Sequence, residues 1–423
     1  GLGNIWKFPY MVGESGGAAF VFVYLLCIAL IGLPILVSEW LIGRRGQKNP
    51  ASTMSELARK ANKPRAWAIV GISGIIGAFL ILSFYSVIGG WSLYYTVNSV
   101  SGAFNGQDAD AIGALFNGML SNPGLLLLGH SVFMLLVIGI VARGVTKGLE
   151  GAVRILMPVL ALLLVVLIGY GMTTGYFSEA LAYMFNPDWS KLSAETVLAA
   201  LGHAFFTLSL GMGIMMAYGS YLGKEINLIQ TARTVIIMDT VIALGAGLAI
   251  FPIVFANNLD LASGPGLIFV TLPLAFGNMD GGSLLGLMFF LLLTFAAITS
   301  AISLLEPVVE FIEERTPLSR VTATIVAGVG AWLLGIAALL SFNVWSEPLM
   351  FGLGVFDLLD TLTSKIMLPL TGLGAILFTA WCLDRKSVEA ELGLSATGVS
   401  VWNIIARYVA PAGVIAVFIT GLI

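Results

Sequence analysis

Charged residues are scarce in this chain: 10% of its 423 residues are Asp, Glu, Lys or Arg. Soluble proteins carry roughly 25%, so the composition excludes an ordinary soluble domain. Hydrophobic residues make up 58%, and the mean hydropathy is +0.98. No nucleotide or nucleic-acid motif is visible, and a net charge of −3 identifies no partner in so apolar a chain. The lipid bilayer is therefore the expected environment.

Cysteine and histidine are also rare, with two of each. Cys27 and Cys382 lie in apolar runs, which predicts small buried side chains and not a disulfide. His130 and His203 are isolated and have no metal-ligand partners in the sequence. No Ser/His/Asp set, pair of acids or metal-ligand cluster of an enzyme is visible, so we do not expect an enzyme.

Long apolar runs dominate what is present, and a bilayer-crossing helix needs about 20 such residues. The chain begins inside one of these runs, so we expect part of the first span to precede Gly1. Counting that remainder, the sequence predicts eleven spans near residues 1–16, 18–43, 67–99, 124–142, 148–172, 196–222, 230–257, 283–312, 318–341, 352–382 and 400–422.

Basic residues in the short loops predict the orientation, because they favour the cytoplasmic side. Residues 44–65 carry seven Lys or Arg against one acid, Glu56, whereas residues 101–123 carry Asp108 and Asp110 and no base. The loop after the second span, and with it the N-terminus, should be cytoplasmic in a multi-pass protein of the cell membrane.

Two stretches interrupt the helical pattern inside apolar spans. Residues 1–4 read Gly-Leu-Gly-Asn, and residues 209–213 read Ser-Leu-Gly-Met-Gly. Backbone at membrane depth leaves helical geometry where protein or a water-filled cavity receives the freed polar groups, and such breaks mark binding sites in transporters. For the second stretch, a helix contact through small residues is an equally open explanation.

The positions of the interruptions favour an inverted repeat. They fall in spans one and six, and an offset of five spans makes the second group of helices cross in the opposite sense. We therefore expect an all-α membrane protein with a first repeat at 1–172, an extracellular connection at 173–195, a second repeat at 196–382, and a cytoplasmic loop with span eleven at 383–423.

The opening motif carries a family resemblance. Gly1-Leu2-Gly3-Asn4-Ile5-Trp6-Lys7-Phe8-Pro9-Tyr10 resembles the first-helix signature of the neurotransmitter:sodium symporters. The similarity extends through Glu39 and Trp40 in span two, the sixth-span block and the Thr299-Ser300 pair. It implies the five-plus-five fold of the LeuT type, in the bacterial amino-acid branch, with eleven spans and a broken first and sixth helix.

The resemblance implies sodium-coupled symport of hydrophobic or aromatic L-amino acids by alternating access. Sodium at two sites is the expected cofactor, and transport should not need chloride. A non-transporting amino-acid receptor on the same fold is the alternative, and the gate residues Lys7, Asp360 and Glu314 speak against it. The oligomeric state stays open.

The first sodium site is expected at Asn4, Thr207 and Asp239. An Asn can also cap a helix, and a Thr can bond back within its own helix. Asp239 stands alone in an apolar span, where a carboxylate is costly and usually functional; a snorkelling acid is the alternative. Where relatives that use chloride place an Asn, this chain has an acid, which predicts chloride independence.

A second sodium site is expected at the carbonyl of Ala296 with Thr299 and Ser300. The i, i+3, i+4 spacing places these three residues on one helical face. Outside the resemblance, a Thr-Ser pair in a membrane helix is usually an interhelical contact.

Gly1 indicates the substrate class, because it leaves room for a substrate carboxylate where monoamine transporters of the family carry an Asp. The resemblance places that carboxylate near the backbone of Leu2 and Gly3 and the hydroxyl of Tyr85. The substrate side chain should then meet a mostly apolar wall, to which Met212 adds an adaptable group; the wall also includes Ile81, Phe206, Thr207, Ser209, Ala301 and Leu304.

The resemblance also predicts residues that close the protein on its outer and inner sides, and the sequence suggests a hinge in span five. Lys7 and Asp360 match an outer ion pair, with Tyr85 and Phe206 as the lid beneath it, although each charge alone could be a solvated helix end. Glu314 matches the acidic member of an inner gate. Gly148 and Pro158 could hinge the cytoplasmic half of span five, and the buried acids Glu39 and Glu306 could hold unwound backbone.

Overall fold

The computed structural model describes residues 1–259 and 266–422, and this part of the chain is helical, without a β-sheet. The α-helices are α1 (Phe8–Glu14), α2 (Ala18–Cys27), α3 (Leu33–Gly46), α4 (Pro50–Lys60), α5 (Ala68–Ser101), α6 (Ala109–Leu120), α7 (Pro123–Val141), α8 (Gly151–Thr173), α9 (Phe177–Phe185), α10 (Ala194–Thr207), α11 (Ile214–Ser220), α12 (Leu228–Ala256), α13 (Leu272–Gly277), α14 (Gly282–Arg315), α15 (Arg320–Leu340), α16 (Val355–Thr361), α17 (Leu368–Leu377), α18 (Arg385–Leu392), α19 (Ala396–Ile404) and α20 (Ala410–Leu422).

Short wider turns of π geometry extend or join several of these helices. They are η1 (Gly3–Lys7), η2 (Ile28–Gly32), η4 (Val145–Glu150), η6 (Leu267–Thr271), η7 (Leu362–Met367), η8 (Phe378–Cys382) and η9 (Ile405–Val409). Joined in this way, nine helical segments of the described chain are long and apolar enough to cross a bilayer: Ala18–Gly46, Arg65–Ser101, Pro123–Val141, Val145–Thr173, Leu228–Ala256, Gly282–Arg315, Arg320–Leu340, Val355–Cys382 and Ala396–Ala416. These nine match nine of the eleven expected spans.

The two remaining expected spans are those predicted to be broken. The sixth consists of α10 and α11, separated by the non-helical residues 208–213. In the first, helical geometry begins at Leu2 and runs through η1 and α1, so of the block 1–4 only Gly1 lies outside the helix.

The break between α10 and α11 has a clear backbone cause. Ser209, Gly211 and Gly213 all have positive φ, at 55°, 74° and 70°, a region that L-residues with side chains rarely adopt. At Gly211 a Cβ atom would also lie 2.3 Å from the carbonyl oxygen of Leu368 on α17. The glycine therefore permits both the turn and the close approach of α17.

Capping residues set many of the helix starts. Asn49 accepts a hydrogen bond from the Ser52 amide at the start of α4, and Ser193 and Ser319 cap α10 and α15 in the same way. Such caps satisfy amide groups that the first turn leaves unpaired.

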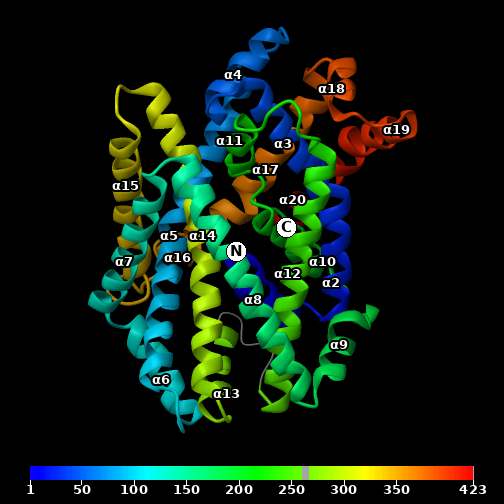
Figure 1. The fold of residues 1–423 in the computed structure, drawn as a ribbon. Helices are drawn as coiled ribbons and strands as arrows, with labels where there is room; N and C mark the ends of the chain where they lie inside the picture. The colour runs from blue at the N-terminus through cyan, green and yellow to red at the C-terminus, as the bar shows by residue number, and fades with distance from the viewer. Residues whose placement is uncertain (260–265, 423) are drawn as a thin grey trace.

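The long helices α5 and α14 pack along each other at the centre of the molecule, and α11 packs on α3 (Figure 1). The helices α4, α18 and α19 gather at one end, while α6, α9 and α13 lie at the other (Figure 1). Helix α4 belongs to the basic loop, so its end is the one that the sequence predicts to be cytoplasmic.

Candidate functional site

Three side chains from three separate elements meet where the first sodium site is expected. Asn4 lies in η1, Thr207 ends α10 at the break, and Asp239 lies in the middle of α12. The Asn4 amide nitrogen donates to Asp239 Oδ1 at 2.7 Å, and the Thr207 hydroxyl lies 3.0 and 3.1 Å from the two oxygens of Asp239. The Thr207 hydroxyl also contacts Asn4 Oδ1.

In this cluster, hereafter the Asn4–Thr207–Asp239 cluster, the side-chain oxygens outnumber the hydrogens that the three side chains can donate to them. One hydroxyl hydrogen of Thr207 faces Asn4 Oδ1 and both oxygens of Asp239, and it can serve one of them well. A sodium ion prefers several oxygen ligands of this kind. The donor set therefore fits a small hard cation, with the carboxylate supplying one negative charge.

Tyr24 is a neighbour of this cluster that the sequence reasoning missed. Its hydroxyl donates to Asp239 Oδ2 at 3.4 Å, and its ring packs with Phe8, Phe20 and His203. The sequence offered one indication of this contact: Tyr24 lies in an apolar span, and a buried tyrosine hydroxyl usually has a hydrogen-bond partner.

A small cavity adjoins the cluster. Its volume is about 30 Å³. The wall consists of nine of the eleven predicted substrate residues and Ser300: Gly1, Gly3, Ile81, Tyr85, Phe206, Thr207, Ser209, Met212, Ser300 and Leu304.

Two predicted substrate residues do not line the cavity. Leu2 and Ala301 are fully buried, although the Leu2 amide donates to the Tyr85 hydroxyl at 3.3 Å. Thus Tyr85 and the backbone of Leu2 lie together as expected, while the side chains of Leu2 and Ala301 pack elsewhere.

The expected second sodium site is divided between a helical turn and the cavity wall. The Thr299 hydroxyl donates to the Ala296 carbonyl at 3.0 Å, which places two of the three expected ligands together on α14. Ser300 lines the cavity instead, and a Cβ on Gly1 would lie 2.1 Å from its hydroxyl oxygen. Ser300 therefore faces Gly1 closely, a contact that the sequence did not predict.

The residues predicted to form the outer gate also lie together. Lys7 Nζ is 3.9 Å from Asp360 Oδ1 and 4.5 Å from the centre of the Phe206 ring. Phe206 and Tyr85 both line the cavity. Lys7 therefore lies close both to Asp360 and to Phe206, one of the two residues predicted to form the lid.

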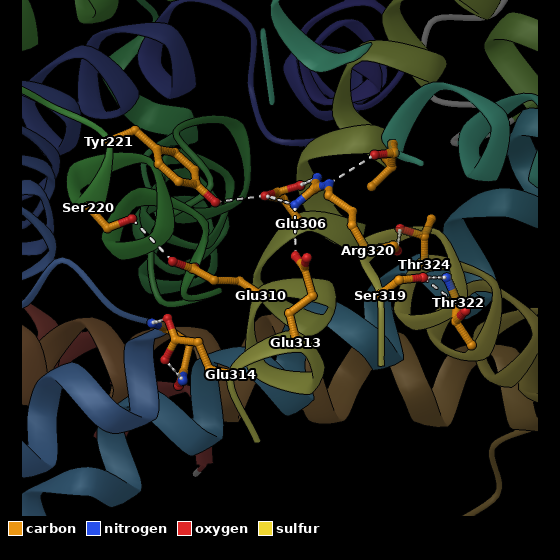
Figure 2. A network of polar contacts seen from close by, with 12 residues as sticks. Ser220, Tyr221, Glu306, Glu310, Glu313, Glu314, Ser319, Arg320, Thr322 and Thr324 are labelled. Atoms are coloured by element: carbon orange, nitrogen blue, oxygen red, sulfur yellow. Dashed lines mark hydrogen bonds and ion pairs between the residues drawn. The ribbon is translucent and has the colours of Figure 1, made fainter. Parts of the chain in front are cut away.

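The buried acids have different roles from one another. Glu39, fully buried in α3, accepts a hydrogen bond from the Gly211 amide at 2.8 Å, which is the expected support of unwound backbone. For Glu306 the same expectation was wrong. Arg320 and Tyr221 bind Glu306 instead, with the hydroxyl at 2.8 Å (Figure 2), because the arginine starts the neighbouring helix at that depth.

Glu314, predicted for the inner gate, and Gly148 and Pro158, predicted for the hinge, lie in or next to helices. Glu314 Oε1 accepts from the Asn49 amide at 2.8 Å, so its partner among the described residues is the cap of α4. Gly148 lies in the π turn η4 and Pro158 lies inside α8, so span five is wound through both. A Cβ on Gly148 would lie 2.1 Å from the Ile140 carbonyl, which shows how closely the two helices approach here.

The chain is similar to known proteins along its whole length. The model of the "Sodium:neurotransmitter symporter family" matches residues 1–112 and 111–423. A sodium-dependent transporter of Bacillus subtilis named YhdH is 38% identical over 99% of this chain and 93% of its own, and one of Haemophilus influenzae is 32% identical over 100% and 94%. Both are described as uncharacterized.

A solved structure has the same fold. The crystal structure of MhsT in complex with L-phenylalanine superposes with a TM-score of 0.92 at 44% identity, covering 99% of this chain and 95% of that one. The apolar helices and these similarities identify a multi-pass, sodium-coupled membrane transporter with the fold that the sequence predicted. The chain belongs to the sodium:neurotransmitter symporter family.

Proposed function

We propose that this protein imports hydrophobic and aromatic L-amino acids together with sodium by alternating access. The main support is Thr207, which belongs both to the cavity wall and to the Asn4–Thr207–Asp239 cluster. A substrate in the cavity and a cation in the cluster would share this residue. Each ligand then stabilises the arrangement that the other needs, which is the physical basis of coupling.

The chemistry of the cavity supports an amino-acid substrate. Among the described residues the wall has no acidic side chain, and the Tyr85 hydroxyl and the backbone of Gly1 and Gly3 offer polar contacts. Ile81, Met212 and Leu304 add apolar surface to the same wall. L-Phenylalanine in the MhsT complex has the same combination of a carboxylate and an apolar side chain.

Two sodium ions are proposed, one at the Asn4–Thr207–Asp239 cluster and one at Ala296, Thr299 and Ser300. Asp239 supplies a negative charge at the first site, so we expect transport without chloride. Cytoplasmic opening is proposed to bend span five between Gly148 and Pro158, with the N-terminus on the cytoplasmic side.

Uptake into proteoliposomes tests this proposal. Labelled L-phenylalanine and L-leucine should accumulate with an inward sodium gradient and not with choline in its place, whereas an acidic amino acid should not accumulate. Thr207→Val keeps the shape of the side chain without the hydroxyl, and it should weaken sodium and substrate binding together. Sodium-dependent binding without uptake would favour the receptor alternative, and uptake without sodium would contradict the proposal.

A further inference from the structure

The cytoplasmic end of α14 carries four acids within its last three turns: Glu306, Glu310, Glu313 and Glu314 (Figure 2). Three of them have firm partners. Glu306 and Glu313 share the guanidinium of Arg320, and Glu314 is held by Asn49. The fourth, Glu310, has no basic partner among the described residues.

Glu310 is nevertheless buried. Glu310 is 7% exposed, and its Oε2 has no hydrogen-bond partner among the described residues. Oε1 lies 3.2 Å from the hydroxyl oxygen of Ser220, at the end of α11 (Figure 2). A buried carboxylate with neither a cation nor adequate donors is strongly disfavoured.

The Ser220 contact indicates which group donates. A serine hydroxyl has one hydrogen, and the Ser220 oxygen lies 2.7 Å from the Ala217 carbonyl, which can only accept. Ser220 therefore donates its hydrogen to the Ala217 carbonyl, which is the nearer of the two groups. The contact with Glu310 then becomes a good hydrogen bond when Glu310 carries the hydrogen and donates it to Ser220.

The charged groups around Glu310 also favour its protonated form. Glu306 and Glu314 on its own helix place negative charge beside it. From α15, Arg320 is the opposing cation, and two acids already share it. From α11 and the residue after it come the hydroxyls of Ser220 and Tyr221, and the Tyr221 hydroxyl donates to Glu306.

We propose that Glu310 is a proton-binding site that holds the cytoplasmic end of α11 against α14. The proton is bound while the two helices are in contact. When α11 moves away, water reaches Glu310, the bond to Ser220 is lost and the proton is released. The contact therefore links cytoplasmic acidity to the opening of the transporter on that side, independently of which amino acid is carried.

The sign of the pH effect follows from linkage. The closed arrangement binds one proton more than the open one, so acid favours closure and alkali favours opening. Glu310 titrates at different pH values in the open and in the closed arrangement. Between these two pH values, the ratio of closed to open molecules should change by up to about tenfold per pH unit.

Infrared difference spectroscopy at pH 7, without added amino acid, tests the proton directly. Glu310→Gln should remove a carbonyl stretching band of a protonated carboxyl that the unmodified protein shows. The matched control is Glu56→Gln on α4, because Lys48 and Lys60 lower the pKa of Glu56 to about 2 and keep it ionised. Identical spectra for the unmodified protein and Glu310→Gln would overturn the proposal.

A second variant keeps the test decisive if Glu310→Gln does not fold. Ser220→Ala leaves the carboxyl in place without its acceptor, so the band should remain and shift, and an unchanged band would contradict the assigned hydrogen bond. The measurement is repeated in choline in place of sodium. A band that appears only after sodium is removed would show that the site takes a sodium ion and not a proton.

Hydrogen exchange tests the link to opening. Exchange of the amides of Ile214–Ser220, corrected for the intrinsic effect of pH, should increase with pH in the unmodified protein and be insensitive to pH in Glu310→Gln. Equal pH dependence in both proteins would overturn the link. These readouts do not need transport, so they are separate from the test of the proposed substrate.

Discussion

Asp239 is the residue on which the candidate ion site depends most. It contacts Asn4, Thr207 and Tyr24, which come from three different helical elements. Its two oxygens accept from more than one side, and its charge can balance that of a cation at close range. The sequence showed that an acid lies at membrane depth, and the structure adds the groups that orient it.

Asp239→Asn tests the charge. Removing it should weaken sodium binding by at least about tenfold, which corresponds to roughly 1.4 kcal/mol. Uptake should then be lost or become dependent on chloride, because an anion could replace the missing charge. The measurement is uptake with gluconate in place of chloride, in both proteins. If the unmodified protein stops without chloride, the proposed role of Asp239 is wrong.

Gly1 tests the substrate carboxylate, and its close contact with Ser300 calls for two variants. Gly1→Asp should abolish uptake by placing an anion against the carboxylate. Gly1→Ala adds no charge but would press on the Ser300 hydroxyl, 2.1 Å from the added Cβ, and should lower affinity less. Because Ser300 is itself a proposed sodium ligand, the double variant Gly1→Ala with Ser300→Ala is compared with Ser300→Ala alone. If the loss is steric, Gly1→Ala should lower the affinity less in the Ser300→Ala protein than in the unmodified one. Normal uptake by Gly1→Asp would refute the assignment.

Among the elements, the break between α10 and α11 contributes most to the site. Its unwound residues bring Thr207 to the ion cluster and Ser209 and Met212 to the cavity. Glu39 holds the Gly211 amide from the neighbouring α3, and α17 closes over the same glycine. A continuous helix here would use these backbone groups internally, and none would be available for ligands.

Gly211→Ala tests the break. The change should lower the free energy of unfolding by at least about 1–2 kcal/mol, the cost of left-handed backbone for a residue with a side chain, and the clash with Leu368 adds to it. Gly202→Ala in α10 is the matched control, because no described atom beyond its chain neighbours and the adjoining backbone of its own helix lies within 4 Å of the added Cβ, and it should be neutral or slightly stabilising. Thermal unfolding in detergent checks both. Equal stability of the two variants would contradict the account of the break.

Across the whole molecule, coupling between sodium and substrate should appear as shared stabilisation. Ligands that bind the folded state raise its apparent stability, and two ligands that strengthen each other raise it by more than the sum of their separate effects. We expect sodium with L-phenylalanine to exceed that sum by about 1–3 kcal/mol.

Thermal unfolding with each ligand alone and with both measures this excess. Asn4→Ala should reduce the effects of both ligands and remove most of the excess, since Asn4 contacts both Thr207 and Asp239. An unchanged response to sodium in Asn4→Ala, with L-phenylalanine present, would show that the first site lies elsewhere.

The membrane class, the approximate spans, the break in span six and most of the cavity wall could be predicted from the amino-acid sequence. These features depend on the hydropathy of local runs, on glycine-rich blocks and on a specific motif, all of which can be read along the chain. The nine continuous spans and the interruption of span six also follow from local composition. The interruption expected at residues 1–4 does not, because Leu2, Gly3 and Asn4 are helical.

Which polar groups meet depends on the packing of the helices and could not be predicted from the sequence. Tyr24 lies against Asp239, Ser300 beside Gly1, Arg320 on Glu306 and Ser220 on Glu310. Each of these pairs except Arg320 and Glu306 joins residues at least 90 positions apart in the sequence, and that exception joins two helices across a turn. Hydropathy records how deep a residue lies in the membrane, but the direction of its side chain depends on how helices pack against one another, which no local pattern specifies.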